Sequence, residues 1–170
     1  MKKLNGYPNW FFWLLIFTSV LTLATGVLMI PGALEFKLQW EVDWRLSGEQ
    51  RLPMVMLHVL SGWLLLMILG ALWQVHLRAG WRQRKNHLSG ITLALCLCVL
   101  AVTGIGLYYL GSELGQTISS VTHSGTGILF GLIIGWHIWH GGQIRMDKRR
   151  KQSVRLNSLQ PGLVAKTDAA

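Results

Sequence analysis

The chain has 170 residues, of which 51% are apolar and 14% are charged. Because an average soluble domain is about a quarter charged, this composition disfavours a single water-soluble domain. The net charge of +9 is concentrated near the chain ends and in one connector, as membrane topology requires, and we expect no nucleic-acid partner.

Four long stretches without Asp, Glu, Lys or Arg predict four membrane-spanning helices. Each contains about 20 or more mostly apolar residues, the length that an α-helix needs to cross ~30 Å of hydrocarbon. The remaining chain is too short for a soluble catalytic domain. We therefore predict a membrane domain over 1–143 and a basic cytoplasmic tail over 144–170. The charge-free stretches are 4–34, 52–77, 86–112 and 114–143.

Proline and glycine mark the expected helix ends. The predicted helices cover about 9–30, 53–78, 87–109 and 117–140, with Pro31-Gly32 ending the first and Gly141-Gly142 ending the last. The short later connectors make neighbouring helices antiparallel. The expected fold is therefore an all-α, integral membrane, four-helix up-down-up-down bundle. We expect no internal repeat.

The connector after the first predicted helix has its own pattern. Between Phe36 and Leu46 apolar residues alternate with polar ones, which is the period of a β-strand. A short interfacial helix is the rival, because three aromatic residues lie four apart. In either form we expect a lid on the membrane surface. Its exposed aromatic and acidic side chains predict a docking surface for a partner on the outer side: Phe36, Trp40, Glu41, Asp43 and Trp44.

Basic residues predict the orientation. The termini and the second connector hold thirteen Lys and Arg, whereas the other two connectors hold three. The positive-inside rule then places both termini in the cytoplasm. We expect a multi-pass membrane protein.

Histidines are the most informative residues, because ionisable groups inside a bilayer are costly and mark function. Two lie on the second predicted helix, three on the fourth, and one at the cytoplasmic mouth of the third, where a capping or interfacial role is favoured. In that order they are His58 and His76, then His123, His137 and His140, and finally His87.

Their spacing predicts two facing pairs. His58 and His76 lie five whole turns apart, so both project from one face about 27 Å apart, and His123 and His137 are about 21 Å apart and about 40° out of line. The second and fourth helices run in the same direction, so His58 meets His123 and His76 meets His137. Such pairs suit the axial ligation of two b-type haems. His140 competes with His137 for the inner position.

Other residues fit a cofactor without requiring one. Gly62, Gly127 and Gly131 remove bulk where a flat macrocycle approaches a helix, although glycines at this spacing also serve bare helix contacts. Arg78 either pairs with a haem propionate or belongs to a solvated basic loop. Cys96 and Cys98 lie on roughly opposite sides of a helix and cannot form a disulfide with each other.

Three short segments carry a resemblance to a known group. The segments LHVLSG at 57–62, HSGTG at 123–127 and WHIWH at 136–140 resemble the bacterial di-haem b-type cytochromes that anchor respiratory complexes, such as the γ subunits of formate dehydrogenase, hydrogenase and nitrate reductase. The first helix here has no histidine, which is closer to the cytochrome b core of bc-type complexes.

The resemblance implies two haem b groups and a place in the bacterial inner membrane. It also implies electron transfer between membrane quinone and a redox protein, either a dehydrogenase or a multihaem cytochrome c. Asn86, His87 and Glu113 are candidates for handling quinone protons. One alternative is a free-standing quinol oxidoreductase that reduces superoxide or ferric iron. Another is a haem-free zinc or copper transporter, which predicts carboxylates or thiols beside the histidines.

Overall fold

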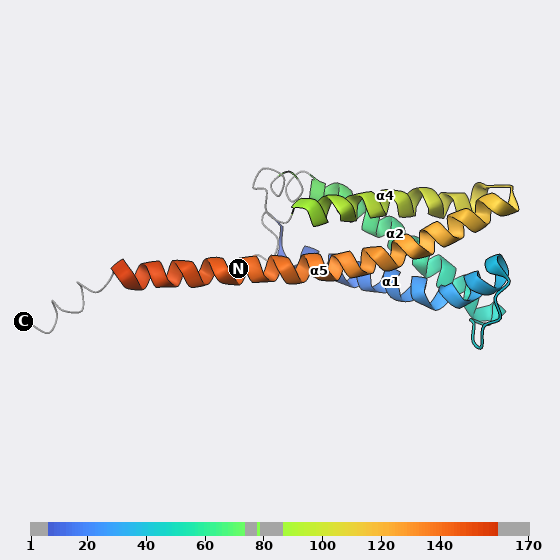
Figure 1. Cartoon of the computed structure of the whole chain (residues 1–170), viewed down its shortest axis with the longest axis horizontal. Coiled ribbons are helices and arrows are strands. Elements are labelled where there is room, and N and C mark those ends of the chain that lie inside the picture. Colours follow the sequence, from blue (N-terminus) through green and yellow to red (C-terminus); the bar gives the residue numbers. More distant parts are fainter. Residues whose placement is uncertain (1–6, 74–77, 79–86, 160–170) are drawn as a thin grey trace, which may run out of the picture. The chain divides into compact units, whose positions relative to one another are not determined.

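The computed structural model describes residues 7–73, 78 and 87–159, and all regular structure in these ranges is helical. Four long helices follow in chain order: α1 (Asn9–Leu38), α2 (Gly48–Leu72), α4 (His87–Tyr109) and α5 (Glu113–Leu159) (Figure 1). All four are long and apolar enough to cross a membrane. The predicted all-α membrane fold is confirmed.

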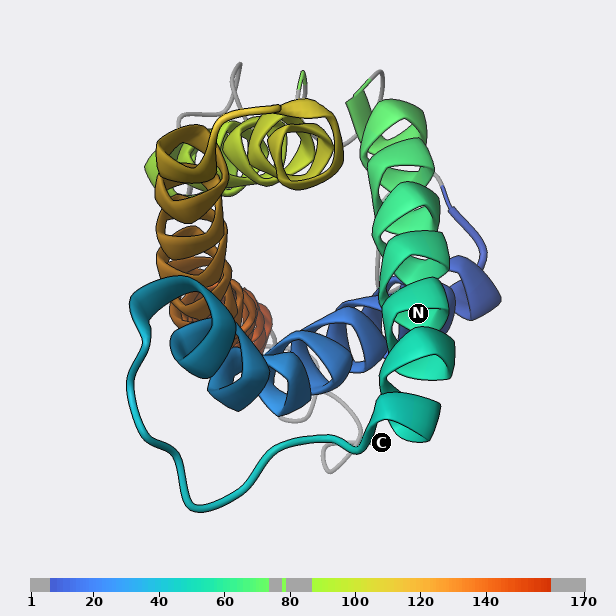
Figure 2. The ribbon, with the colours of Figure 1, turned by 90° about the vertical axis from the view of Figure 1, so that its right-hand side faces the viewer.

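The chain divides into two compact units within α5. The first, Met1–Ile134, contains α1, α2, α4 and the beginning of α5, and the second is Gly135–Ala170. In the first unit the four helices follow one another around a common centre (Figure 2).

Hydrogen bonds at both ends of the first unit show how α1 runs relative to α2 and α5. The Tyr7 hydroxyl donates to the Ala71 carbonyl, so the start of α1 lies beside the end of α2. Lys37 Nζ donates to Gln116 Oε1 at 2.6 Å, so the end of α1 lies beside the start of α5. α1 is therefore antiparallel to both α2 and α5.

Apolar side chains join the helices of this unit. One cluster contains Phe11 of α1 and Ile68 and Leu72 of α2. A second connects α2, α4 and α5 and consists of Leu65, Cys96, Leu97 and Phe130. Other large apolar side chains face outward, and Val102 and Leu132 are each 70% exposed, as a surface surrounded by lipid tails requires.

The first helix is longer than the sequence predicts. Pro31 lies inside α1, which continues to Leu38, so the predicted end at residue 30 is wrong. Proline removes one backbone donor, a loss that membrane helices tolerate. Gln39 caps the helix with a left-handed φ of 55°. The N–H groups of Gln39 and Trp40 donate to the carbonyls of Glu35 and Leu34 in the last turn at 3.2 and 3.3 Å.

The alternating segment at 36–46 forms neither a strand nor a separate helix. Its first three residues complete α1, and 39–47 have no regular structure. The connector folds back on the end of α1, because Arg45 pairs with Glu35 at 2.9 Å and the Arg45 and Arg51 guanidinium groups each lie 5.0 Å from the centre of the Phe36 ring. These contacts with the helix end replace the regular pairing that a strand needs.

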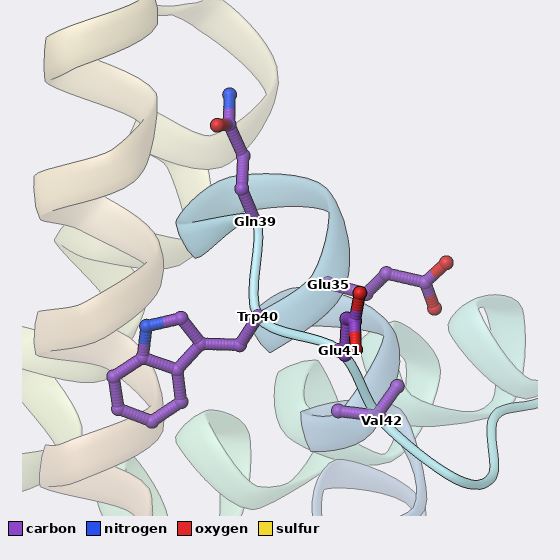
Figure 3. A pocket seen from close by; sticks show the side chains of 5 residues that line it. All are labelled: Glu35, Gln39, Trp40, Glu41 and Val42. Carbon is purple, nitrogen blue, oxygen red and sulfur yellow. The ribbon is translucent and has the colours of Figure 1, made fainter.

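A shallow hollow of about 290 Å³ lies at this turn. Figure 3 shows the Trp40 indole and the Glu35 carboxylate extending to opposite sides of the chain. The hollow therefore has one aromatic and one acidic border, and its lining consists of Glu35, Gln39, Trp40, Glu41 and Val42.

Capping side chains explain the early start of α2. Ser47 Oγ accepts the Gln50 N–H at 3.4 Å, and the Gln50 side chain accepts the Ser47 N–H at 3.3 Å. This capping box starts the helix at Gly48 and leaves Pro53 inside it, so the predicted start at 53 is too late. The third predicted helix, by contrast, is confirmed at both ends as α4.

The last helix exceeds its predicted range of 117–140 at both ends. It begins at Glu113, where the Ser112 hydroxyl accepts the Gly115 N–H at 3.2 Å. It continues through Gly141-Gly142 to Leu159. Two glycines cost about 1 kcal/mol each relative to alanine, and the following residues are rich in Arg, Lys, Gln and other good helix formers, so the helix persists into the predicted tail.

Candidate functional site

His58 of α2 and His123 of α5 face each other inside the first unit. Their ring centres are 6.0 Å apart, and their planes are inclined by 69°. Both side chains are half-buried. The expected meeting of these two residues is therefore present, and their role as metal ligands stays a prediction.

One face of α1 holds the His58 ring in place. His58 Nδ1 lies 3.1 Å from the Thr22 carbonyl oxygen and 3.0 Å from Thr25 Oγ1. A carbonyl oxygen only accepts, so the network assigns the ring proton to Nδ1. Nε2 then carries the free lone pair, which is the form of imidazole that binds a metal.

A glycine lets the His58 ring approach α1 closely. A Cβ atom built on Gly26 would lie 3.1 Å from His58 Cε1, which is tighter than ordinary van der Waals contact. Gly26 follows Thr25 directly, so one dipeptide supplies both the hydrogen-bonding oxygen and the space for the ring.

His123 has equivalent surroundings on α4. Its Nδ1 lies 3.0 Å from Thr103 Oγ1, and the ring also hydrogen-bonds the Leu100 backbone. A Cβ on Gly104 would lie 3.4 Å from His123 Cε1. The same tautomer follows, so both histidines keep Nε2 available.

The pair has no hydrogen-bond partner at either Nε2 within the described ranges. The described residues also contain no group of three or more His, Cys, Asp and Glu side chains that could hold a metal ion. Within the described residues, the imidazoles of His58 and His123 are therefore the whole donor set at this position.

The predicted glycines have different surroundings. A Cβ on Gly62, one turn along from His58, would meet nothing within 4 Å, and one on Gly127 would meet only Leu100 at 3.9 Å. A Cβ on Gly131 would lie 3.2 Å from the Leu23 side chain. Gly131 thus serves a contact between α5 and α1, whereas Gly62 borders open space.

The structure does not describe the predicted inner pair of His76 and His137 as it describes His58 and His123. His76 lies outside the described residues, and His137 and His140 belong to the second unit. The His140 ring stacks on Trp136, with ring centres 6.0 Å apart and planes 8° apart. His137 is half-buried, while His140 is exposed. The choice between them stays a prediction.

The other residues predicted to bind haem or to handle quinone protons show no contact with the histidine pair in the described part of the chain. Arg78 is exposed, and Glu113 is exposed in the first turn of α5. Asn86 lies outside the described residues, and the side chain of His87 is not described. Sequence reasoning missed the Thr-Gly dipeptides at 25–26 and 103–104, although their presence in alternate helices was the signal that could have found them.

Comparisons with known proteins provide no relative: no protein-family model, curated protein or solved structure matches the chain. The resemblance to di-haem b-type cytochromes accordingly stays a proposal.

Proposed function

We propose that this chain is a transmembrane electron-transfer subunit in which His58 and His123 would hold one haem b. A second haem b is held by His76 and His137. The chain relays electrons between the quinone pool and a respiratory redox protein, in the inner membrane of a bacterium. The observation that carries the proposal is the facing pair of imidazoles, 6.0 Å apart, with both Nδ1 atoms already engaged.

The donor set favours haem over a bare metal ion. Zinc in proteins takes three or four protein ligands, and the described residues contain no such cluster. A haem brings four pyrrole nitrogens and needs only two protein ligands to complete six-coordination. Two neutral imidazoles across a helical bundle supply that requirement, which supports haem over the transporter alternative.

When bound, haem would supply one-electron transfer between a donor and an acceptor. The residues of this chain would orient the two imidazoles. The backbone carbonyls of Thr22 and Leu100 accept the ring protons, so Nδ1 carries the proton and Nε2 is the nitrogen left to bind a metal. Outward-facing apolar side chains hold the bundle in lipid.

Charge distribution supports the direction of the bundle. With thirteen basic residues on one side and three on the other, both termini lie in the cytoplasm. His58 lies in the third turn of α2 and His123 in the third turn of α5. The haem between them is then the one nearer the periplasm, below the connector at 39–47, where the redox partner docks.

The test is a spectrum and a cofactor count on the purified full-length chain. We expect a reduced-minus-oxidised spectrum of a b-type cytochrome, two haem b per chain in the pyridine haemochrome assay, and reduction of the haem by added quinol. Elemental analysis of the same sample distinguishes the alternatives. A chain that carries zinc or copper and no haem would refute the proposal.

A further inference from the structure

The two halves of the histidine pair are built from one repeated sequence pattern. The first helix of each half carries Thr-Gly, and the second carries His, then Ser or Thr three positions later, then Gly. A further Gly follows 12 positions after the histidine in both. The expectation of no internal repeat is therefore wrong. The matching residues are Thr25, Gly26, His58, Ser61, Gly62 and Gly70 in one half and Thr103, Gly104, His123, Thr126, Gly127 and Gly135 in the other.

This repeat is difficult to recognise in the sequence because the connectors of the two halves differ in length. Residues Thr25 and His58 are 33 positions apart, whereas Thr103 and His123 are 20 positions apart. The difference of 13 positions (33 minus 20) lies in the helix ends and the longer connector between α1 and α2. Only the packing of α1 on α2 and of α4 on α5 brings the equivalent residues into register.

Hydrogen bonding repeats with the sequence. Thr25 Oγ1 donates its proton to the Leu21 carbonyl at 2.8 Å, and Thr103 Oγ1 donates to the Val99 carbonyl at 2.7 Å. Because each hydroxyl proton goes to the preceding helical turn, the hydroxyl oxygen faces the ring as an acceptor. Each histidine lies 3.0 Å from its threonine.

We propose that Thr25 and Thr103 are equivalent positioning residues that act through His58 and His123. Each accepts a share of the Nδ1–H hydrogen bond, fixes the ring orientation and makes Nε2 a stronger donor to iron, as outer partners of metal-bound histidines do. Greater ligand basicity stabilises the ferric state and lowers the reduction potential. This inference rests on the proposed function, because the basicity of Nε2 matters only when it binds the metal.

A purely structural role for these threonines makes a different prediction. Threonines in helices commonly donate to the carbonyl four residues earlier, and Thr92 of α4 does so at 3.0 Å with no histidine beside its hydroxyl among the described residues. Thr92 therefore has the helix bond without the ring contact. It provides a matched control on the same helix as Thr103.

The experiment compares Thr25→Val and Thr103→Val with the wild-type chain, with Thr92→Val as the control. Valine keeps the shape and removes the acceptor. We expect both variants to raise the midpoint potential of one haem, to change its low-spin ferric EPR signal, and to weaken haem retention about ten- to hundredfold. Thr25→Ser and Thr103→Ser keep the hydroxyl and should restore wild-type values, and Thr92→Val should match the wild type.

Three outcomes would overturn the inference. One is that both valine variants keep the wild-type potential and EPR signal. Another is that the serine variants shift as far as the valine variants, which would assign the effect to packing. The third is that Thr92→Val shifts equally. If the wild-type chain binds no haem, the proposed function itself fails, so the two failures are distinguishable. If one valine variant does not fold, the other tests the same equivalence against its serine partner.

Discussion

Replacing Gly26 by alanine should weaken the binding of the outer haem, which is the one proposed to lie between His58 and His123. It should not destabilise the helix that carries the substitution. The added Cβ would lie 3.1 Å from His58 Cε1, and ordinary contact begins at 3.4 Å. The ring must therefore retreat by about 0.3 Å (3.4 minus 3.1), which is a large part of the ~0.5 Å within which a ligand must be held.

This retreat lengthens the hydrogen bonds that hold the ring. His58 Nδ1 lies 3.0 Å from Thr25 Oγ1 and 3.1 Å from the Thr22 carbonyl, so an added 0.3 Å takes both past the usual range of about 2.7–3.2 Å. Losing a hydrogen bond of this kind costs about 1 kcal/mol, which corresponds to about a fivefold loss of haem affinity.

Two other glycines serve as matched controls. Gly32 is on the same helix, and a Cβ there meets nothing within 4 Å, so Gly32→Ala should keep full haem content and gain up to about 1 kcal/mol of helix stability. Gly104→Ala places Cβ at 3.4 Å from His123 and should have little effect.

The assay measures haem per chain and the rate of haem loss to an excess of apomyoglobin, with thermal unfolding followed by circular dichroism. We expect faster haem loss only for Gly26→Ala. Equal haem loss from Gly26→Ala and Gly32→Ala would refute the reasoning, because the only relevant difference between them is the contact with His58.

Three further predictions concern the inner haem, the connector and the orientation. His137→Ala should remove one haem, while His140→Ala should spare both because His140 already stacks on Trp136; the reverse pattern in the pyridine haemochrome assay would reassign the inner ligand. Replacing Trp40 and Trp44, which are 61% and 54% exposed, with alanine should leave both haems bound but reduce co-purification of the redox partner severalfold, and an unchanged yield of the complex would contradict the docking surface. A reporter fused after Ala170 should be active only in the cytoplasm, and periplasmic activity would reverse the orientation.

The membrane helices could be predicted because hydropathy and length decide them. Hydrocarbon excludes unpaired backbone groups, so a charge-free apolar stretch of this length has one stable form. The bounds of α4 followed directly. The meeting of His58 and His123 also followed, because a fixed helical period places each histidine on a defined face at a defined depth.

The ends of the helices and the residues that hydrogen-bond the two imidazole rings were harder to predict, because they depend on contacts with other segments. Pro31 and Gly141-Gly142 are local helix breakers, and each was outweighed by the stretches around it. The end of α1 depends on a left-handed residue at Gln39, which the sequence does not mark. Thr25 and Thr103 come within hydrogen-bonding distance of the histidine rings only because α1 packs on α2 and α4 packs on α5.

The most direct test of the central claim is the haem content of His58→Ala, of His123→Ala and of the double variant. If both residues bind the same iron, each single variant keeps one haem per chain, and the double variant also keeps one, because the second substitution removes nothing further. Equal helical content by circular dichroism confirms that the variants are folded. A folded double variant that loses both haems, or single variants that keep both, would contradict the claim that His58 and His123 together hold one haem.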